Sequence, residues 1–365
     1  MNQSDARIRD VRIYHAVSTL SRAISDSTHQ LSEIAFYVLE LETFGGSVGQ
    51  GYLLQFHYSP EAIKGALLDL RRFVLERDYR VYETRALQED YEAESEYFGI
   101  SGLQRWALSV MNVAMWDAWS RMNDQPVYRM LGSGRKRIPV YGSGGWISYT
   151  DEELQEEVVN YKKRGFTAVK VKVGSPDMER DIRRLHLVRE AVGSDVKIMM
   201  DANQGMDSAR AVELVNSVSE IGIYWFEEPV RNTDFDGYES IHRKSSVSLA
   251  MGEREYNTVA LRELIGRKAI DLWQPDLIRL GGVEAWRDSA ALAAAYHIPT
   301  LPHYYKDYDV PLLATVSMPY GAESFDWIDD IIDVPMTIEN GYALQREGSG
   351  FGFSFRQQYL TEVKG

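Results

Sequence analysis

The sequence predicts an α/β protein built around a parallel (β/α) barrel, with an α+β block in front of it. From residue 135 onward, short apolar strands alternate with amphipathic helical segments. Alternation over about 200 residues favours a closed barrel over an open sheet. Before residue 135, two strands come first and two helical segments follow, which is an α+β arrangement. After residue 335, no further strand–helix unit follows.

The N-terminal block opens with two strands joined by a glycine-rich turn, in "IAFYVLELETFGGSVGQGYLLQF". Its helical segments are "PEAIKGALLDLRRFVLE" and "SGLQRWALSVMNVAMWDAWSRMN". The stretch "GGSVGQG" superficially resembles a dinucleotide-binding loop. Because it lies between two strands and opens no helix, we interpret it as a hairpin turn.

The barrel is predicted to have eight strands and seven intervening helices. Most of the helical segments begin near an Asp or Ser cap and end in Gly or a basic residue. The predicted strands are Ile138–Ser143, Ala168–Val173, Lys197–Asp201, Tyr224–Glu227, Leu249–Gly252, Leu272–Asp276, Pro299–Pro302 and Ser324–Ile328. The tail after them is expected to pack back on the N-terminal block.

Composition excludes several classes of function. The 365-residue chain has a net charge of −14 and no basic patch, which argues against a nucleic-acid partner. It has no cysteine, so disulfides, thiolate metal sites and a cysteine nucleophile are excluded. The opening segment has no apolar core, and no apolar run approaches the ~20 residues of a membrane helix. We therefore expect a cytoplasmic protein without a membrane partner.

Ionisable side chains recur where the predicted strands end. In "FTAVKVKVGSPD", Lys170 and Lys172 fall on one face because side chains alternate along a strand. The other strand ends supply Asp201, Asn203, Glu227, Glu228, Glu253, Asp276, His303, Glu323 and Asp326. Taken singly, such residues are as often helix caps or solvated side chains. Because the C-terminal ends of barrel strands meet at one mouth, their recurrence predicts an active site there.

Three of the carboxylates, Asp201, Glu227 and Glu253, suggest a metal ion. Each is separated from the next by 26 residues, one strand–helix repeat, so they come from adjacent strands. Three acids without a cation would repel one another and raise their pKa values. An all-oxygen site suits a hard cation such as Mg²⁺, which uses few protein carboxylates and leaves positions for water or substrate.

As an ordered set, these residues resemble the enolase superfamily and, more narrowly, its mandelate racemase subgroup. The set consists of "AVKVKVG", "DANQ", "EEP", "GE", "PDLIRLGGV" and the histidine after the seventh strand. The resemblance covers nearly the whole chain. It implies a modified TIM barrel, (β/α)7β, with an N-terminal α+β capping domain completed by the C-terminal tail, and a homo-oligomer. The expected boundaries are 1–134 for the capping domain, 135–335 for the catalytic barrel and 336–365 for the returning segment.

The resemblance also implies an enzyme that abstracts the proton α to a carboxylate, with Mg²⁺ stabilising the enediolate. Asp201, Glu227 and Glu253 would be the metal ligands. Lys172 would be the base on one face of a small carboxylate substrate. The charge of Lys170 would lower the pKa of Lys172 toward neutrality.

His303 would then act on the opposite face of the substrate, with Asp276 fixing its tautomer and favouring the imidazolium form. Glu323 resembles the family's acid on the eighth strand, and Asp326 is the alternative at that position. The expected substrate contacts are Asn203, Ser143, Tyr52 and His29.

Two bases on opposite faces permit either dehydration or racemisation. The segments "STLSRAISDSTHQLSE" and "YYKDYD" are polar, which suits a polyhydroxylated substrate. We therefore favour dehydration of an acid sugar, an aldonate or aldarate, to a 2-keto-3-deoxy acid. The alternatives are a racemase or epimerase of an α-hydroxy acid, a cycloisomerase, and a catalytically silent barrel with a binding role. Muconate-lactonising relatives resemble the set less well, because they carry a lysine where this chain has Asp276.

Overall fold

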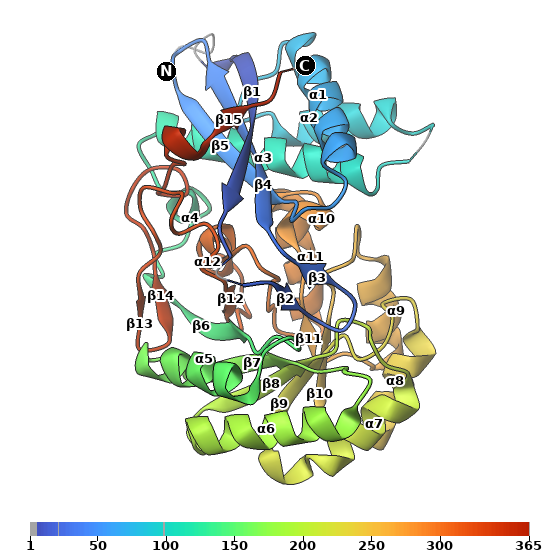
Figure 1. The fold of residues 1–365 in the computed structure, drawn as a ribbon. Helices are drawn as coiled ribbons and strands as arrows, with labels where there is room; N and C mark the ends of the chain where they lie inside the picture. The colour runs from blue at the N-terminus through green and yellow to red at the C-terminus, as the bar shows by residue number, and fades with distance from the viewer. Residues whose placement is uncertain (1–5, 21, 98, 365) are drawn as a thin grey trace.

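A computed structural model describes residues 6–20, 22–97 and 99–364. Figure 1 shows two parts, one above the other: an α+β capping domain at the top and an α/β part below it. Among the described residues, no helix is both long and apolar enough to cross a membrane.

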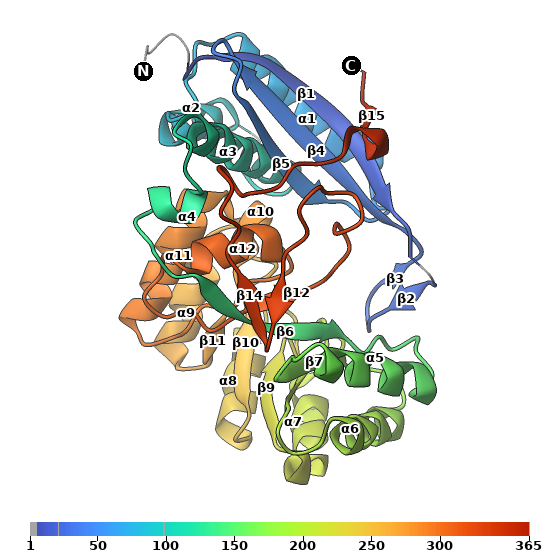
Figure 2. The same cartoon turned by 90° about the vertical axis from the view of Figure 1, so that its left-hand side faces the viewer.

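The capping domain is an antiparallel sheet covered by helices. Its strand order is β15-β1-β4-β5, so the end of the chain pairs with its beginning. Figure 2 shows α1 and α3 against this sheet. The elements are β1 (Ile8–Ser18), β4 (Ile34–Thr43), β5 (Val48–Leu54), β15 (Thr361–Glu362), α1 (Pro60–Leu75), α2 (Thr84–Glu94) and α3 (Leu103–Met122), with a small hairpin of β2 (Ile24–Ser25) and β3 (Gln30–Leu31).

The glycines of the predicted hairpin turn have a second purpose in β5. A Cβ atom added to Gly49 would lie 2.1 Å from the carbonyl oxygen of Ala114 and 2.6 Å from the amide nitrogen of Ala118. Both atoms belong to the backbone of α3, which cannot move aside easily. Glycine is therefore what lets the strand and the helix approach this closely.

The lower part is the predicted barrel. Consecutive parallel strands pair from β6 to β11, and β12 pairs with β6. Thr300 bridges Trp273 of β11 on one side and Pro319, just before β12, on the other, so the ring closes. The strands are β6 (Arg137–Gly144), β7 (Ala168–Lys172), β8 (Lys197–Asp201), β9 (Ile223–Glu227), β10 (Ser248–Met251), β11 (Leu272–Trp273) and β12 (Ala322–Ser324). The fold class expected from the sequence is confirmed.

Three of the predicted strands are wrong in detail. The sixth, predicted as Leu272–Asp276, ends at Trp273, and Asp276 caps α10 (Leu277–Leu280) instead. The seventh, Pro299–Pro302, is reduced to the bridges at Thr300, because prolines have no N–H group to donate to a strand ladder. The eighth begins at Ala322, two residues earlier than predicted, and ends at Ser324. Glu323 therefore lies within the strand, and Asp326 lies after it.

The helices cover the outside of the barrel. Several have the acidic or hydroxyl caps that the sequence indicates: Thr150 and Glu153 form a capping box on α5, and Asp177 caps α6. The helices of this part are α4 (Val127–Met130), α5 (Asp151–Lys163), α6 (Met178–Val192), α7 (Ser208–Ser217), α8 (Phe235–Lys244), α9 (Val259–Arg267), α10 (Leu277–Leu280), α11 (Val283–Ala295) and α12 (Lys306–Leu313), with the 3-10 turn η2 (Ser219–Ile221). A second 3-10 turn, η3 (Gln357–Tyr359), lies in the tail just before β15.

The two faces of β7 have different surroundings. Val169 and Val171 are fully buried in the cluster formed with α5 and α6. Lys170 points the other way, 5.8 Å from the ring centroids of Tyr141 and Trp225 in the barrel interior. The valines thus pack on the helices and the lysines face inward.

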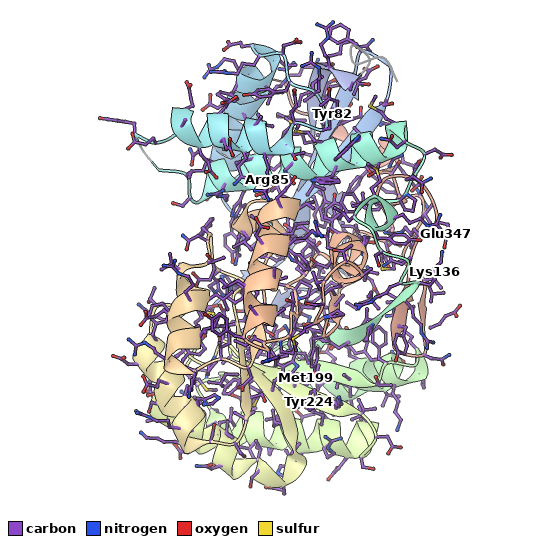
Figure 3. All side chains as sticks on the ribbon, turned by 180° about the vertical axis from the view of Figure 1, so that it is seen from behind. Tyr82, Arg85, Lys136, Met199, Tyr224 and Glu347 are labelled. Carbon is purple, nitrogen blue, oxygen red and sulfur yellow. The ribbon has the colours of Figure 1, made fainter. Side chains whose placement is uncertain are left out.

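The tail contacts both parts of the molecule. The hairpin of β13 (Ile338–Glu339) and β14 (Tyr342–Leu344) pairs with β6 of the barrel, whereas β15 joins the capping sheet. On the surface, Lys136 Nζ lies 2.6 Å from Glu347 Oε1, connecting the start of the barrel to the tail (Figure 3). The tail also contacts the capping domain before β15: the amides of Phe351 and Phe355 donate to Asp117 and Gln50. The expectation that the tail packs on the capping domain thus describes its second half.

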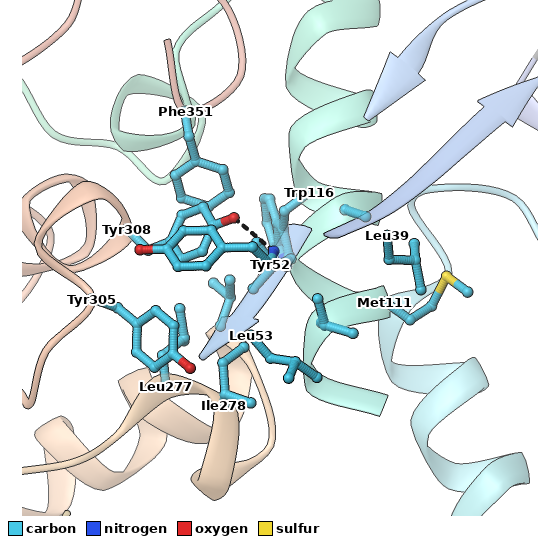
Figure 4. Close-up of a cluster of buried hydrophobic side chains, with 14 of the residues drawn as sticks. Leu39, Tyr52, Leu53, Met111, Trp116, Leu277, Ile278, Tyr305, Tyr308 and Phe351 are labelled. Carbon is cyan, nitrogen blue, oxygen red and sulfur yellow. Dashed lines mark hydrogen bonds between the residues drawn. The ribbon is translucent and has the colours of Figure 1, made fainter. Parts of the chain in front are cut away.

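The segment that follows His303 joins the barrel to the capping domain. The phenol oxygen of Tyr308 accepts a hydrogen bond from the Tyr52 amide at 3.0 Å, and that of Tyr305 accepts one from the Leu54 amide at 3.0 Å. Figure 4 shows the first bond, with Tyr52 packed among Tyr305, Tyr308 and apolar side chains. Tyr52 is buried there and does not line the cavity described below. Its predicted role as a substrate contact is wrong, because its side chain is part of the core between the two domains.

The close approach of β5 to α3 makes a direct prediction. Gly49→Ala should lower the free energy of unfolding by about 1–3 kcal/mol, since the added carbon overlaps backbone atoms. The control is Gly65→Ala in the exposed part of α1, where an added Cβ meets nothing within 4 Å. That change should stabilise the protein by about 0.5–1 kcal/mol. Urea unfolding of both variants measures the difference, and equal effects would contradict this account.

Candidate active site

A cavity of about 260 Å³ lies where the capping domain meets the C-terminal ends of the barrel strands. The capping domain contributes Asp26, His29 and Phe56 to its lining, among others. From the barrel come the polar side chains of Lys172, Asn203, Glu253, Asp276, His303 and Glu323. Five of the ionisable residues predicted from strand ends, together with Asn203, therefore line one cavity.

Lys170 and Lys172 are buried with acidic partners. Lys170 Nζ lies 2.6 Å from Glu227 Oε2 and 2.5 Å from Glu323 Oε1. Lys172 Nζ lies 2.5 Å from Asp201 Oδ2. Only Lys172 lines the cavity, and Lys170 lies beneath it in the barrel interior.

The expected lowering of the Lys172 pKa is not found. Burial and the charge of Lys170 do act to lower this pKa, but the attraction of Asp201 outweighs them, so the pKa lies above its usual value. The short contact with Asp201 is the physical reason, and the strand pattern alone does not predict it. A cation that competed for Asp201 would remove this contact and with it the main cause of the raised pKa.

The three predicted metal ligands lie at the ends of β8 and β9 and just after β10. Glu227 is fully buried, and its Oε1 has no hydrogen-bond partner among the described residues. Burial and the charge of Asp201 raise the pKa of Glu227 well above its usual value. A buried carboxylate oxygen without a partner is unfavourable, and a hard cation would satisfy it. The donor chemistry of Asp201, Glu227 and Glu253 therefore fits Mg²⁺.

These ligands are not yet assembled around a metal position. Within the described part of the chain, no three acidic or histidine side chains converge as a complete metal site. Lys172 binds Asp201, and His303 Nε2 lies 3.4 Å from Glu253 Oε2. A metal would have to displace these two contacts.

His303 and Asp276 form a dyad beside the cavity. The His303 Nδ1 atom lies 2.8 Å from Asp276 Oδ2. The other oxygen of Asp276 accepts hydrogen bonds from the amides of Ile278 and Arg279 at the start of α10, which holds the carboxylate in place. Burial lowers the pKa of His303, but Glu253 and Asp276 raise it more, so it exceeds its usual value. The dyad favours the protonated imidazole.

Glu323 is the strand-eight carboxylate that reaches the site. It accepts hydrogen bonds from the Ser143 hydroxyl at 2.6 Å and the Tyr304 amide at 2.9 Å. Although burial raises the pKa of Glu323, Lys170 and its other cationic neighbours lower it to about 2. Asp326 instead pairs with Arg164, with 41% of its side chain exposed, and does not line the cavity. Ser143, predicted to touch substrate, orients Glu323.

Asn203 and His29 both line the cavity. The backbone amide of Asn203 donates to Asp201 Oδ1 at 2.8 Å. The side-chain oxygen of Asn203, Oδ1, is buried without a partner among the described residues. His29 is held through Nδ1, 3.1 Å from Asp26 Oδ2. Asn203 therefore has one side-chain oxygen without a partner among the described residues, and His29 is oriented by Asp26.

Four residues beside the strand ends have left-handed backbone conformations: Asn203 (φ 41°), Gln204 (φ 67°), Glu228 (φ 36°) and Tyr304 (φ 65°). Non-glycine residues adopt this conformation at a cost, and such residues cluster at functional sites. Three of them directly follow the end of β8 or β9. At these positions the backbone leaves the strand conformation beside the candidate active site.

Sequence reasoning missed much of the cavity wall. Aromatic side chains form a large part of it: Phe56, Trp106, Trp146, Tyr304, Phe325 and Trp327. They lie in loops far apart in the sequence, so no periodic pattern indicates them. In the stretch "YYKDYD", Tyr304 and Tyr305 line the cavity, whereas the charged side chains of Lys306, Asp307 and Asp309 are buried outside it. The lining is thus more apolar than the sequence indicated.

Comparison with known proteins agrees with this arrangement. Residues 8–132 match the family model described as "Mandelate racemase / muconate lactonizing enzyme, N-terminal domain". Residues 153–359, more than half of the chain, match the one described as "Enolase C-terminal domain-like". The chain belongs to the enolase superfamily, in its mandelate racemase subgroup. The sequence resemblance is therefore confirmed.

Relatives of this superfamily member have several activities. It is 28% identical over 337 residues to an arabinonate dehydratase of Saccharolobus solfataricus, with 89% of each chain covered. It is 26% identical over 343 residues to a 3,6-anhydro-alpha-L-galactonate cycloisomerase of Streptomyces coelicolor, with 93% of this chain and 94% of the relative covered. The crystal structure of L-talarate dehydratase from Polaromonas sp. JS666, complexed with Mg and L-glucarate, has a TM-score of 0.89 and 26% identity over 98% and 99% of the two chains.

The His303–Asp276 dyad of this enolase superfamily protein predicts a titration shift. In metal-free protein, Asp276→Asn keeps an acceptor for the α10 amides but removes the charge, so the pKa of His303 should fall. A histidine whose pKa is raised in the folded protein stabilises the fold at low pH, and this stabilisation is lost as the pH rises through the folded-state pKa. In the variant, the stabilisation from His303 should therefore be lost at a lower pH. NMR titration of the imidazole resonances measures the shift, with His242 on the barrel exterior as the internal control. An unchanged or higher His303 pKa would contradict the assignment.

Proposed function

We propose that this protein is a Mg²⁺-dependent dehydratase of an acid sugar, an aldonate or aldarate, which it converts to a 2-keto-3-deoxy acid. One observation supports this most directly: Lys172 and the Asp276-bound His303 line one cavity, beside the buried carboxylate of Glu227, which has one oxygen without a partner among the described residues. Dehydratases of acid sugars among the relatives add support, as does the Mg in the L-talarate dehydratase structure.

Asp201, Glu227 and Glu253 would hold the metal. When bound, Mg²⁺ would stabilise the negative charge that develops on the substrate carboxylate as the α-proton leaves. Glu227 and Glu323 both bind the ammonium group of Lys170. Lys170 therefore balances the charge of the two acids beneath the substrate.

Lys172 would take the α-proton. It needs a lone pair for this, and the loss of its contact with Asp201 to the metal would lower its pKa. His303 would donate its own imidazolium proton to the leaving β-hydroxyl, because Asp276 and Glu253 keep the imidazole protonated. The C–H and C–O bonds broken on adjacent carbons release one water, and the enol product tautomerises to the 2-keto acid. The reverse assignment, with His303 as base, uses the same groups.

A second candidate is racemisation or epimerisation of an α-hydroxy acid. The aromatic lining favours it, since a substrate with an apolar substituent would fit beside Trp146 and Trp327. The same Lys172 and His303 would then remove and return one proton on opposite faces, with no group leaving. The cycloisomerase among the relatives makes ring opening of a cyclic acid a third outcome.

The proposal is tested with a panel of aldonates and aldarates that includes arabinonate, L-talarate and L-glucarate, incubated with and without Mg²⁺. We expect metal-dependent formation of a 2-keto-3-deoxy acid from at least one member.

Lys172→Ala should reduce kcat by about 10²–10⁴-fold while retaining Mg²⁺ binding. Incubation in D₂O with α-hydroxy acids is the counter-test: stereoinversion with deuterium uptake and no keto product would identify a racemase. If neither exchange nor product forms with any acid, the proposed chemistry is wrong.

The metal site makes a separate prediction. Glu227→Gln should weaken Mg²⁺ binding at least about tenfold, because it removes one of three anionic ligands. The matched control is Glu228→Gln, one residue further on, where the carboxylate is already bound by Arg254 at 2.9 Å and Gln204 at 3.0 Å. Isothermal titration calorimetry with Mg²⁺ measures both. Similar affinities for the two variants would remove Glu227 from the ligand set.

A further inference from the structure

The aromatic side chains of the cavity form one continuous surface. Phe325 and Trp327 stack with their ring centroids 4.3 Å apart and an interplanar angle of 22°. Trp327 also stacks on Trp146, at 6.0 Å and 24°. All three line the cavity. We call Trp146, Phe325 and Trp327 the aromatic wall.

The aromatic wall lies next to the reacting groups and the capping domain. Lys172 Nζ is 5.4 Å from the ring centroid of Trp146. At the other side, Trp327 meets the edge of Phe56 from the capping domain, with centroids 5.7 Å apart. A substrate held near Lys172 in this cavity therefore has the aromatic wall beside it.

Two of the three wall residues lie in an irregular loop, residues 325–329, directly after β12. Loops of this kind are usually more mobile than the elements they join. A stacked surface needs its rings held at fixed angles, so something outside the rings has to restrain the loop.

Lys306 supplies that restraint. It is 1% exposed and lies outside the cavity lining. Its Nζ donates to the backbone carbonyl of Phe325 at 2.5 Å and to Asp329 Oδ1 at 2.8 Å, so one ammonium group holds both ends of the loop. Burial lowers the pKa of Lys306, but Asp307 and Asp329 raise it more, so the group is charged. Charge-assisted hydrogen bonds in a buried place are among the stronger polar contacts.

We propose that the aromatic wall determines which acid the site accepts, by packing against the apolar C–H face of the substrate, and that Lys306 is the positioning residue that holds this wall. The inference rests on the proposed function for the identity of the substrate. It adds the surface that selects the substrate, the aromatic wall, and the residue that holds this surface, Lys306. Lys306 does not line the cavity, and it acts on the aromatic wall through its bonds to Phe325 and Asp329 at the two ends of the loop.

The first test needs no substrate. Stacked tryptophans give near-ultraviolet circular dichroism that depends on ring orientation, so Trp327→Leu defines the signal of the aromatic wall. Lys306→Met should lose the same signal while unfolding cooperatively. The matched control is Arg164→Gln, which removes the half-exposed ion pair with Asp326 on the outer side of the same loop. Exposed pairs contribute little, so this variant should keep the wild-type spectrum.

If Lys306→Met does not fold, Asp329→Ala replaces it, because this change releases one end of the loop and leaves the bond to Phe325. It should lose part of the Trp327 signal. A wild-type spectrum in a folded Lys306→Met protein, or in Asp329→Ala when that variant is used, would overturn the positioning role.

The second test uses the acid that the panel identifies as substrate. Trp327→Leu and Lys306→Met should each raise its KM roughly three- to tenfold, the range expected for one lost aromatic contact, with kcat changed less than KM. Arg164→Gln should keep both constants. An unchanged KM in Trp327→Leu would refute the specificity role. If wild-type protein turns over no acid, the proposed function fails, and the circular dichroism comparison still decides whether Lys306 positions the wall.

Discussion

The buried ammonium group of Lys170 is the interaction on which the barrel mouth depends. Removing a charge from water costs several kcal/mol unless well-placed partners compensate. Lys170 has two close partners, Glu227 on β9 and Glu323 on β12, and Asp201 lies further away at 3.6 Å. The ring faces of Tyr141 and Trp225 complete its surroundings. One side chain on β7 thus fixes the ends of strands on both sides of it. It also leaves Glu227 with one unpartnered oxygen, which is the feature that favours a cation.

The cavity lining carries both signs of charge, in a chain whose net charge is −14. Lys172, Arg254, Arg279 and His303 all line the cavity. Each is held by a carboxylate or a backbone carbonyl nearby; Arg279, for example, donates to the carbonyl of Glu253 at 2.8 Å. The carboxylates of Asp26, Glu253, Asp276 and Glu323 line the same cavity and balance these cations. The groups nearest to a bound anion therefore decide its binding, because solvent ions screen the distant charges of the chain.

Periodicity predicts the parts of this molecule that are regular. The alternation in "VKVKV" correctly places valines against the helices and lysines inside, since β-strand side chains alternate. It fails at Pro299–Pro302, where the residues lie in the right position in the ring but cannot form a strand ladder. The direction of the Lys172 pKa depends on one contact with Asp201, and the position of Tyr52 depends on which side of β5 faces the core. Neither follows from spacing. The aromatic wall combines loops about 180 residues apart, which only the folded chain brings together.

The hydrogen bonds of Tyr305 and Tyr308 to β5 have a consequence for how this architecture can vary. The same short segment carries His303 at one end and the two phenols that bind the capping sheet at the other. The two domains are thus not independent modules. A chimera that exchanged the capping domain for that of a relative would inherit a shifted histidine unless residues 303–308 were exchanged with it, so the natural unit of recombination crosses the domain boundary.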